Sequence, residues 1–199
     1  MSNWLNNITL EGELVKLIPL AKEHKNDLLE AAADGELWNL WYTSVPSKDS
    51  IDDDIDFALS ENQQGRAHAF VVVDKKTNRI IGSSRYCNAI NQNRLEIGYT
   101  WYARSFQRTG INTECKYLLL SYAFEQLNCI AVEFRTHWHN FASRRAIARL
   151  GAKQDGVLRN HLQQPDGSYR DTVVFSITRE EWPTVRQSLA YKLKQTYHH

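Results

Sequence analysis

The sequence has few of the features that mark membrane-spanning or secreted proteins. No apolar run approaches the roughly 20 residues that a transmembrane helix needs. The stretch from Met1 to Leu10 lacks both the basic start and the apolar centre of a secretory signal. We therefore expect a cytoplasmic protein with no membrane partner.

Cysteine is also scarce, with only Cys87, Cys115 and Cys129 in 199 residues. An odd number without C-x-x-C spacing excludes a disulfide framework and a zinc knuckle as the organising feature. No base adjacent in sequence marks Cys115 or Cys129 as a nucleophile, so we expect both to pack in the interior.

An excess of positive charge is missing as well. Lysine and arginine total 24 against 23 aspartate and glutamate residues, which gives a formal net charge of +1. A general nucleic-acid binder needs many cations to neutralise phosphates, so this balance favours a small-molecule or peptide partner. The length and the absence of a flexible linker predict a single domain over residues 1–199. Six tryptophans and 11% aromatic residues suit either a large core or shaped pockets.

Hydrophobic periodicity predicts a mixed α and β order along the chain. Residues 67–74, 79–86 and 94–102 alternate as three consecutive strands, which indicates an antiparallel meander. The other predicted elements are a strand at 11–18, helices at 20–33, 37–42 and 47–62, a helix after residue 110, a strand at 129–138, a helix at 140–150 closed by Gly151, a hairpin of 152–163 with 169–177, and a last helix capped by Thr178.

The segment Gln107–Thr113 joins the third strand of the meander to a helix. Free N–H groups at a first helical turn and the positive end of the helix dipole favour anions, and Gly110 permits close approach to the main chain. An ordinary strand-to-helix turn with an Asn–Thr cap explains the same residues. A single glycine does not decide between these alternatives.

Two other clusters have a structural and a functional interpretation. His137 and His139 have the spacing of two metal ligands on one strand face, but no third ligand is near in sequence, which favours structural or substrate-side histidines. The aromatic residues at 37–42 suit core packing or the lining of a substrate cleft. The three adjacent acids at 52–54 point in different directions on a helix and suit a solvated first turn.

The order of elements, together with Gln107-x-x-Gly110 and Asn140-x-x-Ser143, resembles the GNAT acetyltransferases, in particular the RimJ/RimL-like branch. The resemblance covers nearly the whole chain. Further motifs in the branch's order are Leu10-x-Gly12-x-x-Val15-x-Leu17-x-Pro19-Leu20, Glu96-Ile-Gly-Tyr99, Asn112-Thr-Glu114 and Leu150-Gly151-Ala152. The resemblance implies an α+β fold with a mixed, mostly antiparallel twisted sheet of about seven strands. Helices flank this sheet, and it contains a splayed central strand pair.

The resemblance also implies acetyl-CoA as co-substrate and no metal. Asn112 stands where the family loop usually has a second small residue, and asparagine tolerates the left-handed backbone and can cap a helix. Arg104 and Arg108 would add positive charge for the CoA phosphates, or are ordinary surface arginines. The residues implied to bind the cofactor are Trp101, Tyr102, Gln107, Arg108, Thr109, Gly110, Ile111, Asn112, Thr113, Asn140 and Ser143.

Acetyl transfer to an amine needs a base, a polarised carbonyl and a protonated leaving thiolate. Glu96 is the candidate base, because partial burial in its strand would raise the pKa of the carboxylate. The structural alternative is an exposed glutamate that pairs with Arg94 or Arg85. Ser143 is the candidate acid, or it serves only to bond backbone. A strand N–H near Tyr102 would polarise the acetyl oxygen.

These residues predict an acyl-CoA-dependent N-acetyltransferase that acts by direct attack of a primary amine. The resemblance favours a protein N-terminal α-amine of the ribosomal-protein type. The alternatives are a small-molecule amine (antibiotic, polyamine or amino acid), an inactive acyl-CoA-binding module, and a nucleotide-binding regulator, although no G-x-x-x-x-G-K-S/T motif is present. By analogy, a homodimer through the last helix or the final hairpin stays open.

Overall fold

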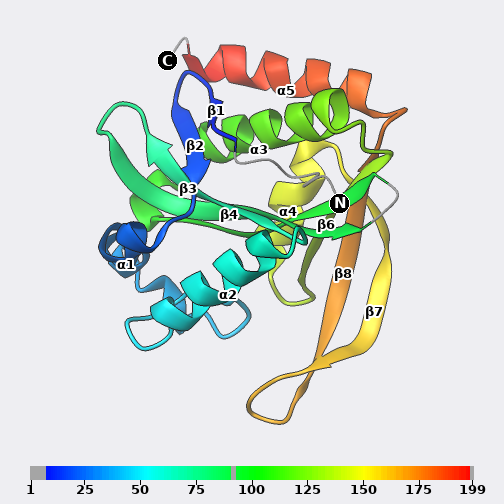
Figure 1. Cartoon of the computed structure of the whole chain (residues 1–199). Coiled ribbons are helices and arrows are strands. Elements are labelled where there is room, and N and C mark those ends of the chain that lie inside the picture. Colours follow the sequence, from blue (N-terminus) through cyan, green and yellow to red (C-terminus); the bar gives the residue numbers. More distant parts are fainter. Residues whose placement is uncertain (1–7, 91–92, 198–199) are drawn as a thin grey trace.

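A single open β-sheet runs through the computed structural model, which describes residues 8–90 and 93–197 (Figure 1). The sheet order is β1-β2-β3-β4-β5-β6-β8-β7. Its strands are β1 (Leu10–Glu11), β2 (Val15–Pro19), β3 (His68–Asp74), β4 (Arg79–Ile90), β5 (Arg94–Tyr102), β6 (Ala131–His137), β7 (Lys153–Gln163) and β8 (Tyr169–Thr178). The predicted meander is confirmed, because β3, β4 and β5 are antiparallel neighbours. The predicted break around Asn91 and the terminal His198 and His199 lie outside the described residues.

The parallel pair β5 and β6 divides the sheet. Cα pairing joins Arg94 to Ala131, Leu95 to Val132 and Glu96 to Glu133, and none is formed further along β5. The two strands diverge beyond Glu96, and their facing N–H and C=O groups have no strand partner over this stretch. The predicted splayed central pair is confirmed.

A β-bulge interrupts the pairing of β5 with its other neighbour, β4. Arg85 pairs with Gly98 and Ser83 pairs with Trp101, so β5 has one more residue than β4 between these pairs. Tyr99 lies in this extra length with a left-handed backbone (φ 51°). A bulge twists its strand and redirects side chains, and this one lies where β5 leaves β6.

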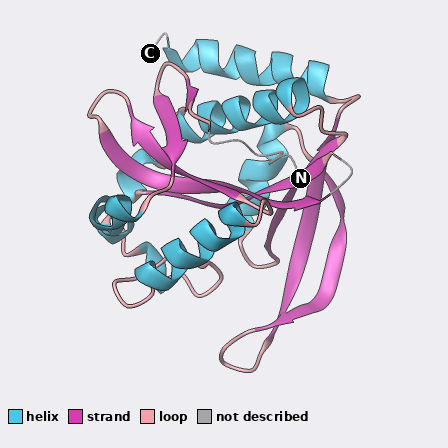
Figure 2. Cartoon of the chain, in the orientation of Figure 1, coloured by secondary structure: helices cyan, strands magenta, loops and turns pink. Residues whose placement is uncertain are grey.

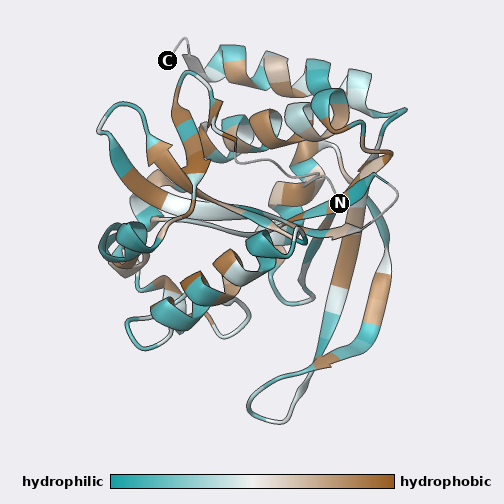
Figure 3. Ribbon diagram, in the orientation of Figure 1, coloured by the Kyte–Doolittle hydropathy of each residue, from teal (hydrophilic) through white to brown (hydrophobic). Residues whose placement is uncertain are grey.

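Helices cover both faces of the sheet (Figure 2). Apolar side chains of α3, α4 and α5 form one core with the sheet, and those of α1 and α2 form a second core on β3. Brown and teal alternate along α2, α3 and α5 in Figure 3, as expected when one side of each helix packs on the sheet. The helices are η1 (Lys22–His24), α1 (Lys25–Ala33), η2 (Leu37–Asn39), α2 (Ile51–Gln63), η3 (Arg104–Phe106), α3 (Ile111–Ser121), its π-helical continuation η4 (Tyr122–Gln126), α4 (Phe141–Leu150) and α5 (Trp182–Tyr197).

Three elements differ from the expected ones. The last helix begins at Trp182, so Thr178, whose N–H donates to Oε2 of Glu181 at 3.0 Å, ends β8 and does not cap the helix. The predicted first strand is split into β1 and β2 by a turn in which the N–H of Gly12 donates to the carbonyl of Val15 at 2.9 Å, so the sheet has eight strands. The predicted aromatic helix at 37–42 is only the short 3₁₀ turn η2. Leu37 is buried there whereas Trp41 is 62% exposed, so no apolar stripe supports a longer helix.

The hairpin of β7 and β8 extends away from the rest of the molecule (Figure 1). The turn between them has Gly167 in the left-handed region (φ 84°), which a residue with a side chain would adopt only with strain. No described helix is both long and apolar enough to cross a bilayer.

Candidate active site

Hydrogen bonds between side chains and main-chain groups fix the shape of the loop from Gln107 to Thr113. Gln107 donates from Nε2 to the carbonyl of Tyr102 at 2.9 Å, and the N–H of Ile111 donates to Oγ1 of Thr109 at 3.3 Å. α3 begins at Ile111, and the N–H of Glu114 makes the bond to the carbonyl of Gly110 (3.0 Å). N–H groups that lie before this bond have no acceptor within the helix. Such groups at the start of a helix bind anions.

The backbone angles of this loop correct two expectations. Arg108 adopts the left-handed conformation (φ 61°), whereas Asn112 lies inside α3. Gly110 has an ordinary φ of −68°, so conformational freedom does not explain the glycine. Lack of space explains the glycine, because a Cβ at position 110 would lie 2.4 Å from Cγ2 of Thr196 and 3.0 Å from Cδ1 of Leu14.

A buried carboxylate fixes the start of α3 to the first turn of the sheet. Glu114 accepts hydrogen bonds from the N–H groups of Glu13 (3.0 Å), Leu14 (2.7 Å) and Val15 (2.8 Å). These are charge-assisted bonds across about 100 positions of sequence, and they hold the loop in place. Apart from the position of Glu114 in a first helical turn, no sequence pattern indicated this role.

The guanidinium of Arg149, on α4, contacts the start of α3. Arg149 donates from Nη2 to Oγ1 of Thr113 at 3.0 Å, although its helix lies more than thirty positions further along the chain. Both arginines expected here, Arg104 and Arg108, are exposed, and the side chain of Arg104 lies beside Gly35. Sequence reasoning missed Arg149, because nothing local relates the end of α4 to the loop.

Trp101 and Tyr102 stand at the open end of β5. The side chain of Tyr102 is buried in the core around α3, and its carbonyl is occupied by Gln107. Trp101 packs at the edge of the core formed with α1 and α2. Contact of Tyr102 with a cofactor would therefore come from its main chain.

Asn140 and Ser143 are brought together at the start of α4. Oδ1 of Asn140 accepts from the N–H of Ser143 at 3.0 Å, which caps the helix, and Gly151 ends the helix with a left-handed φ of 105°. This bond uses the amide oxygen of Asn140 and the backbone of Ser143. It leaves the Nδ2 group of Asn140 and the hydroxyl of Ser143 outside the cap.

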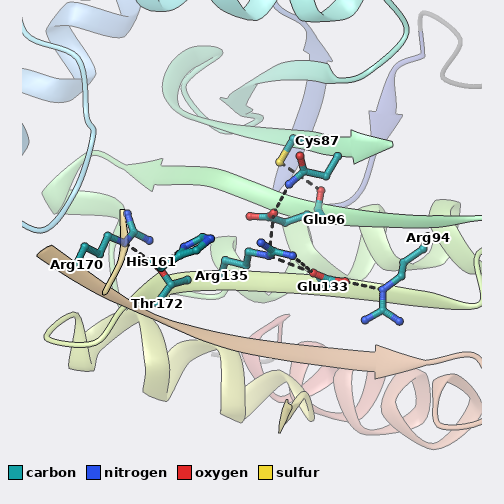
Figure 4. A network of polar contacts seen from close by, with 9 residues as sticks. Cys87, Arg94, Glu96, Glu133, Arg135, His161, Arg170 and Thr172 are labelled. Atoms are coloured by element: carbon teal, nitrogen blue, oxygen red, sulfur yellow. Dashed lines mark hydrogen bonds and ion pairs between the residues drawn. The ribbon is translucent and has the colours of Figure 1, made fainter. Parts of the chain in front are cut away.

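Glu96 is 8% exposed and lies at the point where β5 and β6 separate (Figure 4). Asn88 donates from Nδ2 to Oε2 of Glu96 at 2.7 Å, and Nε of Arg135 lies 3.6 Å from the same oxygen. Burial raises the pKa of Glu96 above its ordinary value, and the negative charge of Glu133 acts the same way. The hydrogen bond from Asn88 and the charges of Arg135 and Arg170 oppose this rise.

The structural alternative for Glu96 is wrong. Arg94 pairs with Glu133 (2.5 Å), and the only ion pair of Arg85 among the described residues is with Asp54 (3.5 Å). Glu96 is therefore a buried carboxylate with a raised pKa and not an exposed partner of either arginine. A group of this kind in a pocket is suited to proton transfer near neutral pH.

A pocket of about 150 Å³ opens beside Glu96, between α2 and the strands β4 and β5. Glu96, the base proposed from the sequence, lines this pocket. The lining residues are Phe57, Glu61, Ala67, Arg85, Cys87, Asn88, Glu96 and Tyr99.

Lys116 is buried behind the β5 bulge, on the α3 side of the sheet. Its Nζ donates to Oγ of Ser84 at 3.1 Å and to Oγ1 of Thr100. Burial lowers the pKa of Lys116 to about 8. The sequence did not indicate this residue, because a lysine within a helix is normally solvent-exposed.

The histidines and cysteines have structural partners. Nδ1 of His137 accepts from the N–H of His139 at 3.1 Å, and the ring of Trp41 packs edge-on against His137 at 5.0 Å between centroids. Within residues 8–90 and 93–197, no group of three or more His, Cys, Asp or Glu side chains could hold a metal ion. Cys115 and Cys129 are buried free thiols, as predicted, and burial raises the pKa of both.

The model of the family described as "Acetyltransferase (GNAT) domain" matches residues 15–153, which include the loop, Glu96, Asn140 and Ser143. The chain belongs to the GNAT acetyltransferase family. The resemblance seen in the sequence is confirmed, and with it the membership of a family of acyl-CoA-dependent N-acetyltransferases.

Solved structures of the family have the same fold. A GCN5-related N-acetyltransferase from Brucella melitensis is 27% identical, with a TM-score of 0.82 over 94% of this chain and 86% of the other. The RimJ protein of Mycobacterium smegmatis, solved in complex with CoA-disulfide, is 23% identical, with a TM-score of 0.78 over 94% and 95% of the two chains. The second likeness shows the fold alone.

Among curated relatives, the [ribosomal protein uS5]-alanine N-acetyltransferase of Escherichia coli K12 is 24% identical over 127 residues. The match covers 61% of this chain and 62% of that protein. Two further curated N-acetyltransferases are matched over 66% and 48% of their own lengths. The chain thus spans less than two thirds of these relatives.

Proposed function

We propose that this GNAT domain transfers the acetyl group of acetyl-CoA to a primary amine by direct attack, and that the acceptor is a protein N-terminal α-amine. The observation that carries the proposal is Glu96, a buried carboxylate with a raised pKa, in a pocket at the separation of β5 and β6. The reaction needs a base at the place where an extended cofactor and an amine can meet.

Acetyl-CoA would bind along the edge left by the two strands and at the start of α3. The N–H groups of Asn112 and Thr113, in the first turn, would hold the pyrophosphate, and Arg149 would add a positive charge beside Thr113. The pantetheine amides would pair with the main-chain groups that β5 and β6 leave unpaired, as a peptide strand does in β-augmentation. Nδ2 of Asn140 would bind the same arm.

The chemical step begins with the amine. An amine with a pKa near ~8 to 10 is mostly an ammonium at neutral pH, so Glu96 accepts its proton, directly or through one water. The nitrogen then attacks the thioester carbon, a C–N bond forms, and the C–S bond breaks when the tetrahedral intermediate collapses. The sulfur leaves with the electron pair and takes a proton from the hydroxyl of Ser143. The nitrogen loses its second proton as the amide forms, and that proton returns through solvent to the oxygen of Ser143.

Negative charge develops on the acetyl oxygen during this step. An N–H group of β5 near Tyr102, beyond the last pair that β5 forms with β6, would donate to this oxygen. A main-chain donor on a strand is already in place before the reaction, so no reorganisation is needed.

A curated relative supports the proposed acceptor. The protein from Escherichia coli K12 is named as an alanine N-acetyltransferase of ribosomal protein uS5, which favours a protein amine over a small molecule here. A small-molecule amine is the alternative within the same chemistry. An inactive acyl-CoA-binding module would keep the loop and the strand gap without using Glu96.

A thiol-release assay with acetyl-CoA and an amine panel tests the proposal. The panel holds peptides with free N-termini, N-terminally blocked peptides with a lysine, polyamines, amino acids and aminoglycosides. We expect turnover with the free N-termini, and mass spectrometry should show one added acetyl group on the α-amine. Turnover with small amines alone would replace the acceptor class. Binding of CoA by calorimetry without turnover on any amine would indicate the inactive module, and thermal stabilisation by ATP but not by CoA would contradict the loop assignment.

A further inference from the structure

Arg85 on β4 has a buried side chain, only 2% exposed, in the same pocket as Glu96. Its guanidinium lies over the ring of Tyr99 at 4.1 Å and near the ring of Phe57 at 5.9 Å from the centroids. The aromatic rings hold the guanidinium plane in one place at little entropic cost. The group is therefore positioned before any ligand arrives.

The charge of this guanidinium is incompletely satisfied. Its one ion pair among the described residues is a long contact of 3.5 Å from Nη2 to Oδ2 of Asp54. Nε and Nη1 are buried and have no hydrogen-bond partner in the described chain. A buried arginine normally has its N–H groups paired, because burial removes the water that would otherwise bind its charged donors. Two donors of Arg85 thus remain available in a pocket that contains a candidate base.

The sheet register fixes the distance between Arg85 and Glu96. Arg85 is paired with Gly98, and Cys87 is paired with Glu96, so the two charged residues are diagonal neighbours on adjacent strands. Diagonal neighbours have Cβ atoms about 7–8 Å apart. The pocket volume of about 150 Å³ is close to that of a cavity that holds a benzene-sized molecule. One small molecular fragment can therefore reach both side chains.

We propose that Arg85 is an acceptor-recognition residue that binds a carboxylate carried by the acceptor a few bonds from the amine that Glu96 deprotonates. The inference rests on the proposed function, since it assumes that the amine lies at Glu96. On a protein N-terminus, the carboxylate is an acidic side chain in the first two residues. On an amino acid, it is the free α-carboxylate.

A single negative charge suits this pocket better than a phosphate. Glu61 and Glu96 also line it, so a dianion would meet two carboxylates. A neutral carbonyl would accept a hydrogen bond but would leave the charge of Arg85 uncompensated. Hydrogen bonds between ionised partners are about twice as strong as neutral ones, which makes the charge of the acceptor a specificity determinant.

Matched acceptors test the proposal. The peptides Ala-Glu-Ala and Ala-Gln-Ala, both as C-terminal amides, differ by one charge, and alanine and alaninamide differ by the free carboxylate. With wild-type protein we expect kcat/KM to be about 10- to 100-fold higher for the charged member of at least one pair. The pair that shows the preference identifies the source of the carboxylate. In R85Q the preference should fall to near unity, with the rate on the neutral member within a few-fold of wild type.

The matched control is R66Q, since Arg66 is an exposed arginine that pairs with Glu61 at the same pocket. It should keep the preference. Equal loss of rate on both members in R85Q would overturn the proposal and assign Arg85 a structural role, as would a wild-type preference near unity for both pairs. If R85Q fails to fold, R85K keeps the charge but moves its donors, and a reduced preference in R85K still supports recognition.

The two proposals fail separately. Thiol release with any amine supports the transferase function whatever the preference. If no amine is acetylated, the function fails, and calorimetric Kd values for Ala-Glu-Ala and Ala-Gln-Ala amides with CoA present still test Arg85. Equal Kd values would then overturn carboxylate recognition.

Discussion

Asn88 donates a hydrogen bond from Nδ2 to Oε2 of Glu96 at 2.7 Å, across the pair of strands β4 and β5. Asn88 has a left-handed backbone (φ 52°) where the register of the two strands shifts. Asparagine tolerates this conformation better than most residues. The register shift at Asn88, in β4, directs its side-chain amide toward the carboxylate of Glu96. The candidate base is thus oriented by a neighbour that also moderates its pKa.

Replacement of Glu96 by glutamine should remove the base and keep the shape of the pocket. We expect E96Q to lower kcat by about 10²- to 10⁴-fold at neutral pH, the usual range for a general base. The Kd for CoA, measured by calorimetry, should not change. E180Q is the control, because Glu180 is an exposed carboxylate that does not line the pocket. Wild-type turnover by E96Q at every pH would exclude Glu96 from the mechanism.

Loss of the Asn88 amide should change the pH dependence of the reaction. The hydrogen bond from Asn88 lowers the pKa of Glu96, so N88A should raise it further. A base works in its ionised form, and the rising limb of kcat/KM should therefore move to higher pH. C87A is the control, since the Cys87 thiol donates to the main-chain carbonyl of Glu96 and not to its carboxylate. A uniform loss of activity without a moved limb would mean that Asn88 only supports the fold.

The hydroxyl of Ser143 can be tested without disturbing the helix. The cap uses the N–H of Ser143, which S143A retains, so the free energy of unfolding should stay within about 0.5 kcal/mol of wild type. If the hydroxyl protonates the leaving sulfur, kcat should fall by about 10²-fold with little change in the Kd for CoA. Unchanged kcat would leave Ser143 with its capping role alone.

A side chain at position 110 should loosen the CoA loop through α5. In G110A the new Cβ would lie 2.4 Å from Cγ2 of Thr196, so we expect a loss of about 1–3 kcal/mol of stability and a weaker calorimetric Kd for CoA. T196S removes this methyl group and keeps the hydroxyl that bonds to the carbonyl of Lys192. G110A with T196S should recover most of both losses. Persistent loss in the double variant would point to the contact with Leu14 instead.

Lys116 should reduce stability at neutral pH. Its pKa is lowered from 10.5 to about 8 in the fold, so the unfolded chain holds this proton more tightly between those values. The resulting penalty, about 3 kcal/mol at most, is full below pH 8 and disappears as the pH rises to 10.5. K116M should therefore be more stable than wild type by about 1–3 kcal/mol at pH 7, and the difference should shrink by pH 10.

Urea unfolding at several pH values measures this difference. Ser84 and Thr100 stay satisfied in K116M, because their hydroxyl oxygens are already 2.8 Å apart. K194M changes an exposed lysine on α5 and should have an effect within about 0.5 kcal/mol at each pH. A K116M variant that is less stable than wild type at pH 7 would show that its hydrogen bonds outweigh the cost of burying the charge.

Much of the fold could be predicted because its signals are local. Alternating apolar residues predicted the meander of β3, β4 and β5, and the sequence placed the start of α4 at Asn140 and its end at Gly151. These signals depend on residues within one or two helical turns or on strand alternation. The short turn at Leu37 was missed, because helical composition alone does not bury a helix face.

By itself the sequence determined most of the order of the elements, and its resemblance to the family singled out Glu96 and Ser143 as candidates. Tertiary structure decided how these residues are surrounded. It joins Glu96 to Asn88 and Arg135, and it places Arg85 in the same pocket through the register of β4 and β5. The burial and pairing of a side chain depend on residues that strand register and helix packing bring together. These residues are far apart in the sequence, so no short-range pattern predicts their contacts.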